Sequence, residues 1–144
     1  MVESFRVAVL DENGQLNPGA IPGGVGGSGG GPLDVAFQFG GTLVVQSGAF
    51  YWLSPGARIR ILRLSITLGV LGNGGGTVTA ALVVNGAAVG SVSVAGGVRA
   101  AVAGTFSPDE IPAQQLVSVD ITDVPTSGTT MPANAVVQVE WEYV

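Results

Sequence analysis

The chain has no cysteine, no histidine and no lysine. The missing cysteines exclude disulfides, thiol nucleophiles and cysteine-bound metal centres. The missing histidines exclude serine–histidine–aspartate and cysteine–histidine catalysis, and the missing lysines exclude Schiff-base chemistry and a P-loop. Most common catalytic mechanisms are therefore closed to this sequence, and we expect neither an enzyme nor a bound cofactor.

Charge is also scarce. Only 10% of the 144 residues are charged, against about 25% in typical globular proteins. All basic residues are arginines: Arg6, Arg58, Arg60, Arg63 and Arg99. The formal net charge is −5 and the isoelectric point is near 4.3. Because nucleic-acid binding needs a clustered basic face, we do not expect a nucleic-acid partner.

Long hydrophobic runs are missing, although 47% of the residues are hydrophobic and the mean hydropathy is +0.52. Gly, Ser, Thr and Asn interrupt every apolar stretch, so no membrane span is predicted. The first residues lack the basic segment and apolar core of a signal peptide. The surplus apolar surface therefore predicts contacts between subunits.

The sequence changes character near residue 32. Residues 5–10 can form one short strand, whereas residues 23–31 include seven glycines and have almost no side chains to bury. A flexible linker and an arm that becomes ordered against a neighbouring subunit both fit this composition. Apolar residues favour the arm, since a pure spacer does not need them. The predicted docking residues of this arm are Phe5, Val7, Val9, Leu16 and Ile21.

From Leu33 onward, apolar and polar residues alternate with the period of a β-strand. The final stretch is an example, with Val137, Val139 and Trp141 separated by polar residues. Asn85-Gly86 is the strongest hairpin turn in the chain. No long window has helical spacing. About eight strands with glycine-rich turns predict an all-β protein, a β-sandwich.

Three local features qualify this pattern. The alternation slips by one residue near Ile61–Arg63, which predicts a β-bulge or a bend where a long strand passes between sheets. Ser107-Pro108-Asp109-Glu110 has the capping pattern of a single helical turn. Residues 72–76 are rich in glycine and predict a hairpin loop.

The order of several short motifs resembles a known family. These are Gly48-x-Phe50-Tyr51-Trp52-Leu53-x-Pro55-Gly56, the long strand 58–68, Val83-Val84-Asn85-Gly86, Leu116-Val117-Ser118-Val119-Asp120-Ile121 and the Ser/Gly/Thr loop 126–130. They resemble a jelly-roll module of tailed-bacteriophage virion proteins of the head-decoration, head-fibre and minor-tail type. The resemblance implies a jelly roll at residues 33–144 behind an arm and linker at residues 1–32. It also implies a virion structural role, often in trimers, and no catalytic residues.

The short segment before the module favours a small accessory subunit. We therefore expect a capsid decoration or accessory head or tail protein, made in the host cytoplasm and located in the virion. Its expected partners are copies of itself, as a homotrimer, and the major capsid or tail protein, but no membrane. The alternative is a receptor- or glycan-binding tip that uses the loops 72–76, 95–97 and 126–130.

Six residues are candidates for the oligomer interface: Tyr51, Arg58, Arg60, Arg63, Glu140 and Glu142. Three cations close together in one strand region repel unless they are paired. We therefore expect the arginines to pair with acids, such as Glu140 and Glu142, on an adjacent strand or across a subunit contact. The two glutamates alternate with Trp141, so a solvated face is favoured over a glycosidase pair. The same alternation separates Tyr51 from Phe50 and Trp52, and it favours a core position for Trp52.

Overall fold

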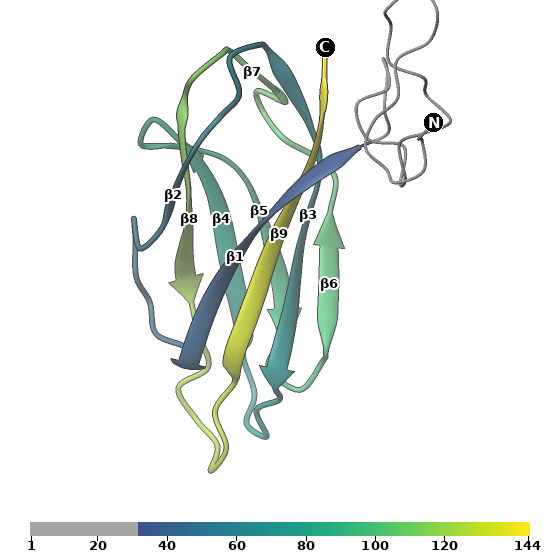
Figure 1. Ribbon diagram of the computed structural model, residues 1–144. Coiled ribbons are helices and arrows are strands. Elements are labelled where there is room, and N and C mark those ends of the chain that lie inside the picture. Colours follow the sequence, from purple (N-terminus) through teal and green to yellow (C-terminus); the bar gives the residue numbers. More distant parts are fainter. Residues whose placement is uncertain (1–31) are drawn as a thin grey trace, which may run out of the picture. The chain divides into compact units, whose positions relative to one another are not determined.

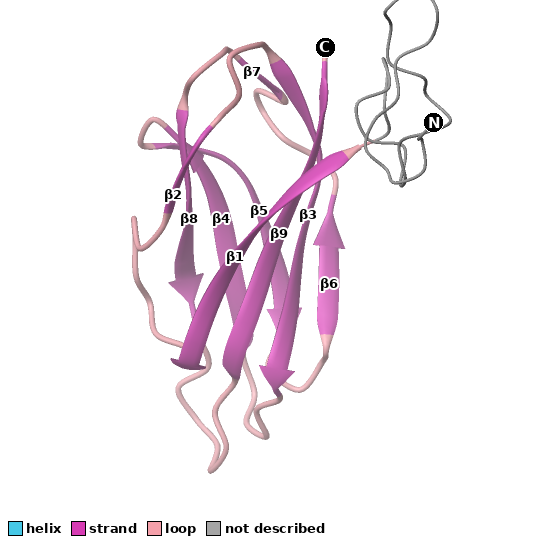
Figure 2. Cartoon of the chain, viewed as in Figure 1, coloured by secondary structure: helices cyan, strands magenta, loops and turns pink. Residues whose placement is uncertain are grey.

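The computed structural model describes residues 32–144, which form two antiparallel β-sheets packed face to face (Figures 1 and 2). The five-stranded sheet has the order β1 (Leu33–Thr42), β9 (Ala133–Tyr143), β3 (Ile59–Val70) and β6 (Ala100–Ala103), with β7 (Glu110–Ile111) also paired to β3. The four-stranded sheet has the order β2 (Tyr51–Leu53), β8 (Leu116–Asp123), β4 (Thr77–Val84) and β5 (Ala87–Ala95). The predicted all-β sandwich is confirmed, with nine strands in this part of the chain.

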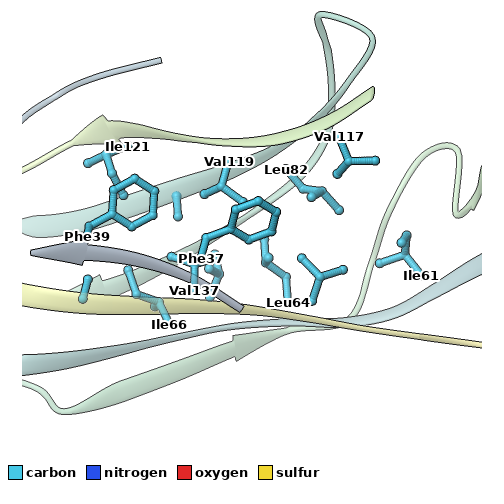
Figure 3. Close-up of a cluster of buried hydrophobic side chains, with 14 of the residues drawn as sticks. Phe37, Phe39, Ile61, Leu64, Ile66, Leu82, Val117, Val119, Ile121 and Val137 are labelled. Atoms are coloured by element: carbon cyan, nitrogen blue, oxygen red, sulfur yellow. The ribbon is translucent and has the colours of Figure 1, made fainter. Parts of the chain in front are cut away.

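The core lies between the two sheets and follows the alternation of the sequence. On β9, Val137, Val139 and Trp141 are buried while the residues between them face outward. Figure 3 shows the rings of Phe37 and Phe39 extending from β1 toward Val119 and Ile121 of β8. Burying each such side chain stabilises the fold by about 1.5–3 kcal/mol.

Among residues 32–144, no helix is long and apolar enough to cross a membrane.

The phase slip in β3 is a β-bulge, as predicted. Ile61 pairs with Trp141 and Arg63 pairs with Glu140, so Leu62 is the extra residue. The bulge keeps apolar residues inward on both sides of the slip, and Leu64 is fully buried. The predicted passage between sheets is wrong. Every pairing of β3 lies within the five-stranded sheet, because the bulge alone absorbs the change of phase.

The Asn85-Gly86 hairpin is also confirmed, since it joins β4 to β5 within one sheet. Both residues have positive φ, 50° and 85°, which is the backbone of a type I′ turn. The prediction for residues 72–76 is wrong, because this loop joins β3 of one sheet to β4 of the other. Local turn chemistry indicates that the chain turns, but it does not specify which sheet the next strand joins.

The predicted helical turn at Ser107–Glu110 does not form, because the chain bends at Ser107 and Pro108 and begins the short strand β7 at Glu110. Ile111 pairs with Ile59 and is buried, and Glu110 lies opposite Arg60. One isolated helical turn fixes several dihedral angles for very few hydrogen bonds. Burial of Ile111 and pairing with β3 therefore outweigh the local capping pattern.

Candidate functional site

The three predicted arginines lie on the outer face of the five-stranded sheet and pair with acids of the same chain. Arg63 Nε is 2.9 Å from Glu140 Oε1, and Arg60 Nη1 is 3.3 Å from Glu142 Oε2. The register of β3 with β9 places Arg60 opposite Glu142 and Arg63 opposite Glu140. Pairing on an adjacent strand is thus confirmed, so these side chains already have partners before any second subunit binds.

Glu110 is a member of this ion-pair group that the sequence analysis missed. Arg60 Nη2 donates to Glu110 Oε2 at 2.9 Å, Arg58 Nη1 lies 3.5 Å from Glu110 Oε1, and Asp109 lies 3.8 Å from Arg60 Nε. The hydrogen bond from Arg60 lowers the pKa of Glu110, and Arg58 lowers it further. The same bond raises the pKa of Arg60. Both groups therefore stay charged near neutral pH, which fits a structural ion pair better than a proton donor.

A small polar hollow lies on the same face, at the Arg63–Glu140 pair. It is lined by Asp34, Arg63, Ser65, Gln138 and Glu140 and has a volume of about 60 Å³. Ligand pockets usually measure roughly 300–1,000 Å³, so this hollow has room for water or a small ion only. No group of three or more acidic side chains in the described part of the chain is arranged to hold a metal ion.

The aromatic run at residues 50–52 alternates as predicted. Trp52 packs against the core and its ring lies 5.6 Å from the ring of Trp141. Phe50 makes an edge contact with Phe39 at 5.4 Å but stays partly exposed. Tyr51 points the other way and is exposed. Trp52 is thus partly buried against the core, on the side that the alternation predicts, and Tyr51 stays available for a partner.

Tyr51 belongs to a larger group of exposed apolar residues in β2, in the segment before it and at the start of β8, which we call the apolar edge. Gln46 bridges to Ile121, and the Gly48 amide donates to Asp120 Oδ1 at 2.9 Å, so the segment before β2 is held against β8. In register, Leu53 lies opposite Leu116. The apolar edge consists of Val44, Val45, Phe50, Tyr51, Leu53 and Leu116, all exposed.

Of the apolar edge, only Tyr51 was predicted from the sequence as an interface residue. One signal was present, because no charged residue occurs between Asp34 and Arg58. Such a run is equally compatible with core strands, so the signal does not separate buried from exposed positions. Leu116 carries no local signal at all, because only the pairing of β2 with β8 brings it beside Leu53.

Three loops that were predicted as a possible binding tip meet at one end of the sandwich, the lower end in Figure 1. The Gly72 amide donates to Gly96 O at 2.7 Å. The Asn73 amide donates to Thr130 O at 3.0 Å, and the Asn73 side chain accepts from the Thr130 amide and donates to Thr129 Oγ1. Asn73 therefore fastens the loop 126–130 to the loop 72–76. The surface that results is uncharged and rich in hydroxyl groups.

The predicted arm residues Phe5, Val7, Val9, Leu16 and Ile21 lie outside the described residues. The described residues form three separate surfaces: the face with the paired arginines and glutamates, the apolar edge, and the end formed by the three loops.

No protein-family model, curated protein or solved structure matches the chain.

Proposed function

We propose that this chain is a non-enzymatic structural protein of a tailed-bacteriophage virion, a capsid decoration or an accessory head or tail subunit. The strand order carries the proposal. With β7 set aside, consecutive strands alternate between the sheets β1-β9-β3-β6 and β2-β8-β4-β5, and only the β4–β5 hairpin stays within one sheet. This is the order expected of a jelly roll, an eight-stranded double sheet that is common in viral capsid and lectin domains.

The proposed working unit has two regions. Residues 33–144 form the jelly-roll body, which associates with copies of itself, as a trimer, through apolar surface. Residues 1–32 form an arm that docks on the major capsid or tail protein through Phe5, Val7, Val9, Leu16 and Ile21. An arm that becomes ordered only on docking loses conformational entropy at that step. Several arms in one oligomer compensate for this loss of entropy, because each bound arm raises the effective concentration of the next arm at its docking site.

The chemistry of the body supports a role in assembly. Arg58, Arg60 and Arg63 are held in ion pairs, and the polar hollow beside Arg63 is too small for an organic substrate. Fold alone does not fix function, since one architecture carries many activities. Strand order and surplus apolar surface together support the proposed role.

The test uses particles of the encoding phage from which this gene has been deleted. Tagged full-length chain and a chain lacking residues 1–31 are mixed with these particles, and pelleting measures binding. We expect the full-length chain to pellet with particles and the truncated chain to stay in the supernatant while keeping its β-sheet circular dichroism. Normal binding by the truncated chain would overturn the docking role of the arm. Failure of the full-length chain to bind would overturn the virion role.

A second candidate is a receptor- or glycan-binding tip, and the joined loops favour it. Asn73 holds two of them in one arrangement, so a ligand would meet a preorganised surface. The loops have hydroxyl and amide groups but no aromatic ring for stacking on a sugar. Glycan-array binding that is lost on Asn73→Ala would favour this candidate over assembly.

A further inference from the structure

The exposed apolar side chains are concentrated on one side of the sandwich. Between residues 32 and 144, twelve large apolar side chains are exposed, and half of them belong to the apolar edge. The others lie elsewhere, as Val102 on β6 illustrates. Exposed apolar residues that occur singly are ordinary on protein surfaces, whereas a group of them in neighbouring segments, such as Leu53 and its register partner Leu116, indicates an interaction site.

The apolar edge also coincides with open strand edges. β1 and β2 are terminal strands of their sheets, and Figure 1 shows the segment between them crossing along one side of the sandwich. Within the described residues each of these strands pairs on one side only. Proteins protect such edges with lysine, proline or covering segments, but β1 contains only Asp34 as a charged residue and no proline. This side therefore offers backbone hydrogen-bonding groups as well as apolar contacts.

We propose that the apolar edge is the contact between copies of this chain. The inference rests on the oligomeric part of the proposed function and specifies which surface forms the oligomer. A second copy fits because none of the six residues of the edge is charged, and Asp120 of the adjoining strand β8 already accepts a hydrogen bond from the Gly48 amide. Two such edges meet without repulsion between like charges.

The remaining surface of a second copy is a poorer partner. The outer face of its five-stranded sheet has most of the charged groups of the described residues: Asp34, Arg58, Arg60, Arg63, Asp109, Glu110, Glu140 and Glu142. Placing this face against the apolar edge would remove water from ion pairs and give no compensating charge. A trimer that places its three apolar edges around the symmetry axis avoids this cost.

The test compares two matched substitutions in the full-length chain. Leu53→Glu places a charge on the apolar edge, at a residue that is 58% exposed, and Val102→Glu places the same charge on β6, at a residue that is 60% exposed. Sedimentation velocity over a range of protein concentrations gives the mass, and circular dichroism gives the fold. We expect an oligomer for the wild type and for Val102→Glu. For Leu53→Glu we expect an association constant lower by about 30-fold or more, the size of a hot-spot loss.

A second edge variant tests whether the loss of mass comes from the contact and not from misfolding of Leu53→Glu. Val45→Glu lies in the segment before β2, is also exposed, and should give the same loss of mass as Leu53→Glu. If both edge variants keep the wild-type mass, the contact lies elsewhere, and the inference fails while the oligomeric proposal stands. If the wild type is itself a monomer, both the inference and the oligomeric proposal fail. The particle-binding test of the arm is independent of either result.

Discussion

The outer face of the five-stranded sheet and the apolar edge belong to one sandwich but differ in charge and in how they meet water. The first concentrates the few charged groups of the chain and pairs them across strands, as Arg63–Glu140 and Arg60–Glu110 illustrate. The second has almost no charge and leaves Tyr51 and Leu53 in water. With only 10% charged residues, the chain cannot cover its whole surface with charge. The uncharged part is therefore the part best suited to lose water against a partner.

The largest expected difference is in the free energy of unfolding, between substitution of a buried leucine and of an exposed one. Leu64 on β3 is fully buried, whereas Leu53 on β2 is exposed. Leu64→Ala should lower the free energy of unfolding by about 2–5 kcal/mol, because the lost contacts leave a cavity. At dilutions where the chain is monomeric, Leu53→Ala should change it by no more than about 0.5 kcal/mol. Urea unfolding at two protein concentrations measures both.

The concentration series decides the role of Leu53. A cost for Leu53→Ala that appears only at high protein concentration supports the subunit contact. An equal cost at every concentration would place Leu53 in the fold of the monomer, and the distinction between the two surfaces would then be lost at that residue.

A second, smaller effect comes from the loops that connect the sheets and so position one surface relative to the other. A Cβ on Gly74 would overlap the carbonyl of Ser127, whereas a Cβ on Gly75 would meet nothing within 4 Å. Gly74→Ala should therefore destabilise the chain by about 1–3 kcal/mol through forced separation of the loops. Gly75→Ala is the matched control and should be nearly neutral. Thermal unfolding of the two variants tests this, and equal melting temperatures would contradict the close packing of the loops.

The sequence predicted the parts of this structure that depend on neighbours along the chain. Period-two alternation identified the strands and their inward residues, and the phase slip at Ile61–Arg63 identified the bulge. The turn at Asn85-Gly86 needed only its two residues. Each of these features follows from backbone geometry within a few residues, so one sequence is enough to find it.

The features that the sequence did not predict depend on contacts between distant segments. Glu110 reaches Arg60 because β7 pairs with β3, and capping residues nearby predicted a helical turn there instead. The sheet that each strand joins is likewise a non-local choice. The apolar edge was not predicted for the same reason, because only the pairing of β2 with β8 brings Leu116 beside Leu53.

The pH dependence of stability tests the charged face alone. The hydrogen bond from Arg60 holds the pKa of Glu110 below its ordinary value of 4.5. A carboxyl with a lowered pKa in the folded state stabilises the fold above the unfolded pKa, and this contribution is lost as the pH falls through the folded pKa. The wild-type melting temperature should therefore fall as the pH decreases below 4.5. Glu110→Gln should be less stable near neutral pH and less sensitive to acid.

Leu53→Ala provides the control for this pH series, because none of the residues of the apolar edge is a carboxylic acid. Its melting temperature should follow the wild-type pH profile with an unchanged shape. A Glu110→Gln profile identical to that of the wild type would mean that the ion pair with Arg60 does not act in solution.

The smallest expected effect is the coupling between Arg63 and Glu140, whose side chains are partly exposed. A double-mutant cycle with Arg63→Ala and Glu140→Ala should give a coupling energy of about 0.5 kcal/mol, the range of surface ion pairs. The coupling should nearly vanish in about 1 M NaCl, where the screening length is only about 3 Å. Association through the apolar edge should persist in the same salt, since it depends on the burial of apolar surface. Salt would thus weaken one surface and spare the other, and loss of both together would show that the subunit contact is also electrostatic.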